Sequence, residues 1–527
     1  MGVSQFLPDN WPWLAVGLVS LYTAYQIFKF IRRRRLYADL PTPPHSLILG
    51  NLAVMGEAVK KYPADIHPQP LFTNLATEHN FEGIYYMDLY PFANPFVFIL
   101  DPALAMQVQS QPNLFPRHQF AIDFLGGIVG KKSIFSTTGA EWHQQRSWFA
   151  PAFSMSHLLT LVPGMIEETL IFKEKLTRFA VSGQTFVMND AAINLTIDLI
   201  GRNVGDIRLR SQVGYSPIQD SFSKAIEWTS SFPDPVWKRV LSPIMMRWYC
   251  WKLDKSLGAV IREKYRQRSG EDGVDKSILD LALRGYNKEK GKLGGGKTVR
   301  ADLDEQFMQI ALDNAKTFFA GGHDTTASLI TYMFYYLSIT PAILARVRVE
   351  HDEVFGAGLD TTIKTLTANP ALINQLPLTL AVLKEVLRLH PVGFTVRQAV
   401  PGATITYNGR SYPMENHMIA VLASSMHRSP DNWSNPNEFD PDRFLNAENN
   451  SSPAWQPFEK GPRNCIGQQL ALLEVKVIGV LMVRWFDFEA RFKDHGLKIE
   501  EWGGRAYQEL KLSAKPKDGI PMVATLR

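Results

Sequence analysis

The segment Phe458-Glu459-Lys460-Gly461-Pro462-Arg463-Asn464-Cys465-Ile466-Gly467 places one cysteine in a turn that is bounded by two glycines. The apolar run Leu470-Ala471-Leu472-Leu473 follows this turn and predicts a helix. Cys465 therefore stands at or just before a helix N-terminus, where unpaired N–H groups and the helix dipole favour a thiolate over a thiol.

The other residues of this turn suit a flat, negatively charged ligand. Gly461 and Gly467 let the backbone come close to such a ligand and point N–H groups at the sulfur. Arg463 is placed to pair with a carboxylate. Haem is planar, carries carboxylates and accepts an anionic sulfur as axial ligand, so the turn predicts haem bound through Cys465.

The turn matches, at Phe458, Gly461, Arg463, Cys465 and Gly467, the signature Phe-x-x-Gly-x-Arg-x-Cys-x-Gly of the cytochrome P450 family, which the chain resembles. The resemblance implies haem b with the Cys465 thiolate as axial iron ligand, and cofactor contacts from Phe458, Arg463 and Gly467. The alternative is an inert buried thiol, the usual fate of a cysteine. The complete pattern favours iron ligation.

The composition is that of a globular protein. The 527 residues carry a net charge of +5, without a long basic block in the body of the chain, which argues against nucleic-acid binding. The chain has two cysteines. If Cys465 holds iron, no disulfide framework remains, as expected on the reducing, cytosolic side of a membrane, and Cys250 is expected to be a packing residue.

The N-terminus carries a candidate membrane anchor. Residues 11–28 are almost wholly apolar and uncharged, and at about 1.5 Å per residue they nearly cover a hydrocarbon core of about 30 Å. Lys29 and the run Arg32-Arg33-Arg34-Arg35 follow at once, and by the positive-inside rule they keep the C-terminal side cytosolic. A buried core helix is the alternative, but four arginines beside it would be costly.

We therefore expect a lumenal tail at residues 1–10, a single transmembrane anchor at 11–30, a basic and proline-rich linker at 31–45 and one haem-thiolate catalytic domain at 46–527. The segment Leu40-Pro41-Thr42-Pro43-Pro44 resembles the hinge that follows the anchor in microsomal members of the family. That resemblance implies the endoplasmic reticulum membrane, with the catalytic domain in the cytosol.

An apolar-periodic run from about 303 to 338 predicts a long helix with Ala320-Gly321-Gly322-His323-Asp324-Thr325-Thr326 in its middle. Each of the two glycines costs roughly 1 kcal/mol relative to alanine, so we expect a cofactor or dioxygen to approach the helix there. The run resembles the family's distal motif Gly-Gly-x-Asp-Thr-Thr. The resemblance implies that Thr325 hydrogen-bonds dioxygen and that Asp324 helps deliver protons for O–O cleavage. The alternative is a kink with Asp324 capping the second half of the helix.

Glu385 and Arg388 share one face of an amphipathic helix predicted for residues 381–390. Such a pair is commonplace by itself. The family, however, joins its Glu-x-x-Arg pair to the arginine of a later Pro-x-Arg-Phe segment, which is Arg443 in this chain. The resemblance implies a buried structural network that secures the cysteine turn and retains the haem.

Trp142 and Arg146 share a helix face at i,i+4 spacing, in a position that resembles the family's helix for the haem propionates. Arg397, in a strand-like segment, is expected to bind the other propionate. An ordinary amphipathic surface is the alternative for Trp142 and Arg146. Further along the chain, Asn408-Gly409 predicts a β-hairpin.

The expected substrate is small and largely apolar. By their position, five aromatic residues are expected to line its pocket: Phe120, Phe124, Phe318, Phe319 and Phe394. The alternative for each of these rings is plain core packing.

The expected fold is mainly α with a small β region, the cytochrome P450 fold, preceded by one transmembrane helix. The resemblance implies a monooxygenase that inserts one oxygen atom of O2 into its substrate. No flavin or nicotinamide motif is evident in the sequence, so electrons are expected from an NADPH–cytochrome P450 reductase, with cytochrome b5 as an optional second donor. The closing segment, residues 506–519, looks most like fungal members that tailor secondary metabolites.

Two other functions stay open. One is a haem-thiolate isomerase or dehydratase that acts on a preformed peroxide, although such enzymes tend to lack an acid–alcohol pair like Asp324 and Thr325. The other is a non-catalytic membrane haem sensor or carrier, which has no evident need for a proton-delivering threonine. Hydroxylation, epoxidation, desaturation and ring rearrangement all stay open as the outcome of oxidation.

Overall fold

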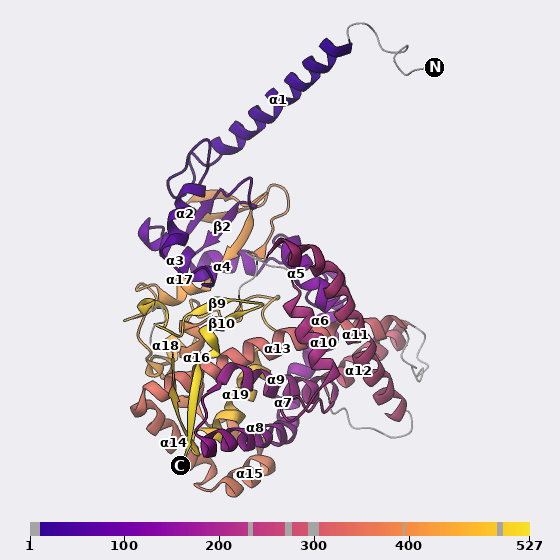
Figure 1. Cartoon of the computed structure of the whole chain (residues 1–527), viewed down its shortest axis with the longest axis vertical. Coiled ribbons are helices and arrows are strands. Elements are labelled where there is room, and N and C mark those ends of the chain that lie inside the picture. Colours follow the sequence, from indigo (N-terminus) through magenta and orange to yellow (C-terminus); the bar gives the residue numbers. More distant parts are fainter. Residues whose placement is uncertain (1–10, 230–234, 269–276, 294–304, 394–395, 493–498) are drawn as a thin grey trace.

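The computed structural model describes residues 11–229, 235–268, 277–293, 305–393, 396–492 and 499–527, which form a mainly helical body with small β-sheets (Figure 1). This confirms the predicted class. The α-helices are, in chain order, α1 (Trp11–Arg35), α2 (Leu52–Lys60), α3 (Pro68–Glu78), α4 (Pro102–Gln109), α5 (Gln119–Val129), α6 (Gly139–Phe149), α7 (Met155–Thr160), α8 (Val162–Ser182), α9 (Met188–Gly205), α10 (Pro217–Glu227), α11 (Val236–Arg268), α12 (Ile278–Leu293), α13 (Glu305–Ile339), α14 (Pro341–Phe355), α15 (Leu359–Ala368), α16 (Pro377–Leu389), α17 (Ala423–Arg428), α18 (Ala447–Asn450) and α19 (Gln468–Met482).

The strands pair into small sheets. One sheet has the order β1-β2-β7-β4, in which β2 and β7 are parallel. A second has the order β3-β11-β8, and β9 with β10 and β5 with β6 form two-stranded pairs. The strands are β1 (Ile84–Met87), β2 (Phe96–Ile99), β3 (Phe186–Val187), β4 (Val396–Arg397), β5 (Thr404–Tyr407), β6 (Arg410–Pro413), β7 (Met418–Val421), β8 (Phe486–Ala490), β9 (Gln508–Leu510), β10 (Ala514–Pro516) and β11 (Pro521–Leu526).

The predicted hairpin at Asn408-Gly409 is confirmed as the turn between β5 and β6. Both residues have positive φ, +49° and +76°, as a two-residue hairpin turn whose twist matches its strands requires.

Helix α13 forms the core of the body. Most of its side chains from Phe307 to Leu337 are buried, and it packs against α9, α16, α19 and β10. It ends at Ile339, just before Pro341, which cannot continue a helix and instead begins α14. The long predicted run is therefore confirmed, and the helix stays continuous through Gly321 and Gly322.

Helix α1 extends away from the rest of the molecule (Figure 1) and exposes apolar side chains along its length, among them Leu18, Leu21 and Phe28. Among the described residues, no single helix has the length and apolar composition needed to cross a membrane. Only the bent pair of α13 and α14, at 112°, meets these criteria jointly, and α13 is a core helix. The predicted transmembrane character of residues 11–30 is not shown.

The junction between α1 and the body depends on one arginine. The helix continues beyond the predicted end of the anchor to Arg35, so residues 31–35 are helical. Arg34 is only 1% exposed, forms an ion pair with Asp88, and donates to the Ile48 and Tyr90 carbonyls at 3.1 and 2.8 Å. One of the four arginines predicted to flank a membrane is therefore part of the body's interior.

Candidate active site

The cysteine turn is held by its own backbone and by α4. The Cys465 N–H donates to the Phe458 carbonyl at 2.9 Å. Gly461 has a φ of +73°, and a Cβ there would stand 2.4 Å from the carbonyl oxygen of Gln109 at the end of α4. Glycine at this position serves the packing of the turn against α4, so the predicted close approach of a ligand does not apply to Gly461.

Gly467 and Cys465 leave room beside the turn. A Cβ built at Gly467 would meet only the Cys465 Sγ, at 3.9 Å, so no other described atom of the chain crowds this position. The Cys465 side chain is exposed, although it lies directly before α19, whose side chains are mostly buried. A glycine without a steric cause, next to an exposed thiol, fits a ligand that lies against the turn.

Burial raises the pKa of Cys465. The N–H groups of Gly467 and Gln468 and the guanidinium of Arg146 lower it, as a helix N-terminus predicts, but they do not outweigh desolvation. The helix N-terminus therefore favours the thiolate, in the predicted direction, and desolvation by the polypeptide opposes it. A metal cation at the sulfur reverses this balance because it stabilises the anion directly. The thiol is thus solvent-exposed although the protein around it disfavours its charged form.

The two glycines of α13 have different roles. A Cβ at Gly322 would stand 2.4 Å from the Ile200 Cδ1 on α9, so Gly322 allows the two helices to pack closely. A Cβ at Gly321 would have no neighbour within 4 Å, and Gly321 is exposed in the middle of a buried helix. The Thr325 hydroxyl donates to the Gly321 carbonyl at 2.5 Å. A ligand therefore has room to approach α13 at Gly321, whereas Ile200 occupies that space at Gly322.

A cluster of four guanidinium groups beside the turn, those of Arg117, Arg146, Arg397 and Arg463, has Glu459 as its nearby counter-charge. Arg463 donates to the Thr137 carbonyl at 2.8 Å, but its Nε and Nη1 are buried without a hydrogen-bond partner among the described residues. Burial, with the charges of Arg117, Arg397 and Arg146, lowers the pKa of Arg463 to about 9, and only Glu459 opposes them. Unpaired donors on a buried cation fit the carboxylates of haem.

Arg397, predicted to bind the other propionate, lies in this cluster, where the chain itself already supplies it with one charged partner. Its Nη2 pairs with the Glu459 carboxylate at 2.6 Å, and its Nη1 donates to the Phe115 carbonyl at 3.4 Å. Arg117 pairs with Arg397 through a backbone β-bridge, and burial lowers its pKa to about 10. Sequence reasoning missed Arg117 because only tertiary pairing brings it to this site.

Trp142 and Arg146 on α6 both face the cysteine turn. Trp142 is buried, and the Arg463 guanidinium carbon lies 4.2 Å from the centre of its ring. Arg146 donates to the backbone carbonyl and the side-chain oxygen of Asn464, at 3.1 and 2.9 Å. The alternative of an ordinary amphipathic surface therefore does not describe this helix.

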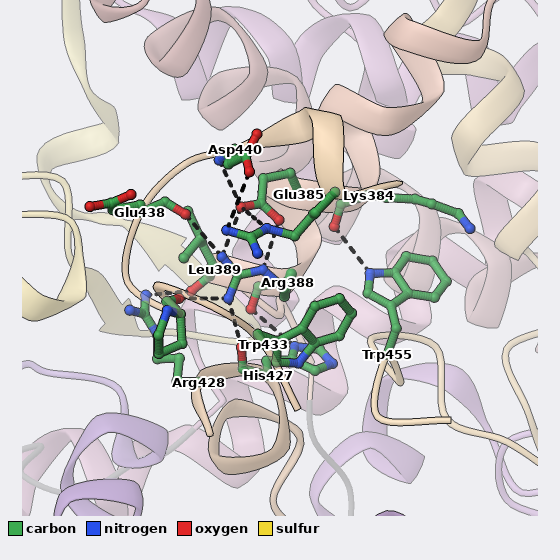
Figure 2. A network of polar contacts seen from close by, with 12 residues as sticks. Lys384, Glu385, Arg388, Leu389, His427, Arg428, Trp433, Glu438, Asp440 and Trp455 are labelled. Atoms are coloured by element: carbon green, nitrogen blue, oxygen red, sulfur yellow. Dashed lines mark hydrogen bonds and ion pairs between the residues drawn. The ribbon is translucent and has the colours of Figure 1, made fainter. Parts of the chain in front are cut away.

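The predicted carboxylate–arginine network is present (Figure 2). Arg388 forks onto Glu385 with bonds of 2.7 and 2.8 Å, and the Arg443 Nε donates to the same carboxylate at 3.1 Å. The Asp440 N–H adds a further bond at 2.9 Å. Glu385 and Arg388 are fully buried, so these bonds replace the water that both charges give up on folding.

His427, which sequence reasoning missed, connects this network to the cysteine turn. Its Nδ1 bonds the Arg388 carbonyl at 3.0 Å, and its Nε2 accepts from the Gln456 N–H at 2.9 Å. Burial lowers the pKa of His427 to about 3, so the imidazole is neutral and can both donate and accept. Gln456 stands two residues before Phe458, which is half-buried and packs against the core and the Trp455 ring.

Asp324 does not cap a kink, because α13 is continuous and the Asp324 carboxylate faces a different element. Ser513 donates to it from its hydroxyl at 2.5 Å and its N–H at 3.2 Å, and the Lys515 ammonium lies 2.6 Å away. Burial favours a raised pKa for Asp324, but His323, Lys515 and Ser513 outweigh burial and lower it. Sequence reasoning identified neither Ser513 nor Lys515.

The predicted pocket aromatics do not form one group. Phe318 packs against Phe149 and Phe153, with ring centres 5.3 Å apart in each pair, and Phe319 packs against Phe222. These two rings are core residues, because the face of α13 on which they lie is turned into the body. Phe120 and Phe124 stack on each other on α5, and Phe120 is 56% exposed. Phe394 lies outside the described residues.

Comparison with known proteins identifies the family. The family model "Cytochrome P450" matches residues 44–515. The chain belongs to the cytochrome P450 family. This P450 is therefore an oxidoreductase of the monooxygenase class, and the family holds haem iron through an axial cysteine thiolate. Membership also implies a redox partner, O2 and an organic substrate.

Its relatives include fungal and animal proteins. The P450 is 29% identical to the cytochrome P450 monooxygenase polC of Polytolypa hystricis, over 97% of this chain and 93% of that one. It is 30% identical to the cytochrome P450 monooxygenase acrF of Aspergillus aculeatus, over 88% and 98%. Cytochrome P450 4X1 of Mus musculus is 26% identical over 87% of both chains. The crystal structure of the cytochrome P450DA heme domain shares the fold, with a TM-score of 0.73, 23% identity and coverage of 93% and 97%.

Proposed function

We propose that this P450 inserts one oxygen atom of O2 into a small, largely apolar substrate and reduces the other to water, as a tailoring step in fungal secondary metabolism. The observation that carries this proposal is the exposed thiol of Cys465, directly before α19. Helix α19 packs against α13. On α13, Gly321 borders open space and is followed by Asp324 and Thr325. The relatives from Polytolypa and Aspergillus, both named monooxygenases, support the fungal tailoring role.

The residues that would hold the haem surround the turn. Cys465 would ligate the iron, and Gly467 and Phe458 would lie against the ring. Arg463 has two buried donors to offer a propionate, and four residues would complete the carboxylate site: Trp142, Arg146, Arg397 and Arg117. The bound haem supplies the activation of O2, which the electron-rich thiolate favours.

Asp324 and Thr325 would handle protons on the distal side. The Thr325 side chain is partly exposed, next to the open space at Gly321, and its hydroxyl is held by the Gly321 carbonyl. Asp324 directly precedes Thr325 in the chain, but its carboxylate faces the hairpin of β9 and β10. We therefore assign Thr325 the task of orienting a proton donor, and Asp324 the task of supplying protons to it.

The substrate pocket is assigned to the space beside α5 and α13. These two helices pack against each other. Phe120 and Phe124 on α5 stack on each other and stay at least partly exposed, whereas Phe318 and Phe319 are buried in the core. Their partly exposed rings support an apolar substrate.

Electrons would come from an NADPH–cytochrome P450 reductase, with cytochrome b5 as a second donor. Basic residues near the cysteine turn support docking of an acidic partner there. Burial lowers the pKa of Lys384, and the positive charge of the nearby Lys460 lowers it further. These two lysines would help to steer a negatively charged reductase to the side of the molecule that holds the thiolate.

We further propose that α1 anchors the enzyme in the endoplasmic reticulum membrane as a single pass, with the tail at residues 1–10 in the lumen and the catalytic domain, residues 46–527, in the cytosol. Exposed apolar side chains on α1, followed by Arg32, Arg33 and Arg35, support this arrangement. Two further exposed apolar residues lie at this junction: Ile48, whose own carbonyl accepts from Arg34, and Phe92, two residues after Tyr90.

The proposed function is tested with the full chain, its reductase and NADPH under isotopically labelled O2. The substrates offered are metabolite fractions that accumulate when the gene is deleted. We expect a product that carries one labelled oxygen atom and does not form without NADPH. Turnover without NADPH would support the isomerase or dehydratase, and binding without ligand-dependent NADPH oxidation would support the sensor. Either result would overturn the proposal.

A further inference from the structure

The C-terminal hairpin of β9 and β10 closes onto the buried carboxylate of Asp324. Ser513, directly before β10, holds one carboxylate oxygen with its hydroxyl and its N–H, and Lys515 within β10 lies 2.6 Å from the other. Both oxygens of Asp324 are thus engaged by a segment that is almost two hundred residues away in the chain.

The hairpin is fixed in this position by several backbone contacts. The Ala514 N–H, between Ser513 and Lys515, donates to the Val392 carbonyl at 3.0 Å. At its other strand, the Leu510 N–H donates to the Asp65 carbonyl at 2.8 Å, and the Gln508 side chain donates to the Pro391 carbonyl at 3.2 Å. These hydrogen bonds therefore hold Ser513 and Lys515 in place beside Asp324.

Solvent reaches Asp324 only indirectly. The Asp324 side chain is 1% exposed, whereas that of Lys515 is 21% exposed. The other charged or titratable group that faces the carboxylate is His323, whose Nε2 lies 4.0 Å from Oδ1 and whose Nδ1 is taken by the Phe319 carbonyl at 2.6 Å. Burial lowers the pKa of His323, so its imidazole takes up a proton less readily than a free histidine does.

The described contacts of Asp324 therefore lead outward through the hairpin. Because Lys515 and Ser513 hold Asp324 as an anion, each proton that Asp324 passes on must first reach it. Lys515 is the charged proton donor in contact with it that also touches solvent.

We propose that Ser513 and Lys515 are positioning residues that hold the Asp324 carboxylate and supply its proton from solvent. The inference rests on the proposed role of Asp324 in proton delivery. In each cycle the Lys515 ammonium, directly or through the Ser513 hydroxyl, transfers a proton to the carboxylate. The neutral carboxyl passes a proton toward Thr325, and the Lys515 amine regains one from water, so that the ion pair is restored.

The first test measures the carboxyl group itself. Infrared spectra of the full-length enzyme are titrated with pH, and the carbonyl band that disappears in Asp324→Asn is assigned to protonated Asp324. In Lys515→Met we expect its midpoint to rise by about one pH unit or more, because an opposite charge is lost next to the carboxylate. Lys511→Met removes an exposed charge from the same hairpin and should leave the midpoint unchanged. An unchanged midpoint in Lys515→Met would overturn the inference.

The second test measures the fate of electrons without a substrate. With reductase and NADPH, each NADPH and one proton reduce O2 to H2O2 when proton delivery fails. We expect Lys515→Met and Ser513→Ala to raise the share of electrons released as peroxide about twofold or more. Lys515→Arg keeps the positive charge, so its share should stay close to that of the wild type. A purely structural role would lower haem content and melting temperature without changing this share.

The Asp324→Asn variant separates the inference from the proposed function. If it raises peroxide release and Lys515→Met does not, the hairpin has no part in proton supply, and the inference alone is wrong. If Asp324→Asn itself leaves peroxide release unchanged, Asp324 does not deliver protons, and the inference fails together with the role proposed for Asp324. The monooxygenase function is tested separately by the incorporation of labelled oxygen.

Discussion

At the scale of single residues, Arg463 shows how a side chain can be unsatisfied without its cofactor. It carries a buried positive charge, two donors without a partner, and a pKa lowered to about 9. Arg463→Met should weaken haem retention about tenfold or more, because hydrogen bonds to a charged group are lost. It should also leave the melting temperature of the haem-free protein unchanged or raise it, because an uncompensated buried charge is removed.

Transfer of haem to an excess of a haem-binding scavenger protein measures this retention. Arg463→Lys, which keeps the charge but not the fork of donors, should lie between the wild type and Arg463→Met. Equal rates of haem loss in all three proteins would show that Arg463 does not bind the cofactor.

Thr325 is the residue whose hydroxyl borders the open space at Gly321. In Thr325→Ala we expect a several-fold rise in the peroxide released per NADPH consumed, with little loss of stability, because the side chain is partly exposed and bonds only its own helix. Thr331→Ala is the control for loss of a threonine hydroxyl elsewhere on α13, where it bonds the Ala327 carbonyl at 2.7 Å. Because Thr331 is buried and also contacts the Asn189 side-chain oxygen at 3.4 Å, its variant should lose more stability and leave peroxide release unchanged. The same peroxide release in both variants would remove Thr325 from its assigned role.

Glu474 on α19 gives a prediction about pH. Burial raises its pKa from 4.5 to about 8, against the opposing hydrogen bond from Asn203. The folded state therefore keeps a proton that the unfolded chain releases, and stability should fall by about 1.4 kcal/mol per pH unit between these two values and stay level above them. In Glu474→Gln this slope should disappear. Chemical unfolding of the haem-free protein across this range measures it, and equal slopes would contradict the assignment.

At the scale of elements, the network of Glu385, Arg388 and Arg443 joins α16 to the segment that leads into the cysteine turn. Glu385→Gln should cost roughly 3–5 kcal/mol and lower haem content, because it leaves buried guanidinium groups without a counter-charge. The exposed pair of Arg346 and Asp442 is the control, and Asp442→Asn should cost only about 0–1 kcal/mol. Similar losses of unfolding free energy in both variants would contradict a special role for the network.

Local patterns predicted the elements that local interactions determine. The apolar period of α13, the glycine before α19 and the Asn408-Gly409 turn each act within a few residues, and each was found where expected. The motif around Glu385 also predicted its partners. Periodicity did not show which face of α13 is turned inward, so Phe318 and Phe319 were expected in the pocket and lie in the core.

Contacts between distant segments could not be predicted from one sequence. Arg117 reaches the arginine cluster through a β-bridge, His427 links Arg388 to Gln456, and Ser513 and Lys515 reach Asp324 through the placement of a hairpin. No sequence motif or regular spacing links any of these residues to its partner. The desolvation that raises the pKa of Cys465 likewise depends on the whole fold and could not be predicted from the helix N-terminus.

At the scale of the whole molecule, the position of α1 depends on Arg34 and Asp88, which are both buried. Deletion of residues 1–28 should release the enzyme from membranes and leave its melting temperature unchanged. Deletion of residues 1–35 should also cost roughly 3–5 kcal/mol, because Asp88 loses its arginine. Adding Asp88→Asn to the longer deletion should recover part of this loss.

Fractionation of cell membranes and thermal unfolding measure these two effects separately. Continued membrane binding after deletion of residues 1–28 would contradict an anchor formed by α1 alone. Equal melting temperatures of the two truncated enzymes would contradict a structural role for Arg34.

The central claim is that Cys465 is the thiolate ligand of a haem iron, and the carbon-monoxide difference spectrum of the reduced enzyme tests it most directly. We predict a strongly red-shifted Soret band in the wild type that is absent from a folded, haem-loaded Cys465→Ser variant. The absence of that band from folded, haem-loaded wild-type enzyme, or its persistence in the variant, would contradict the claim.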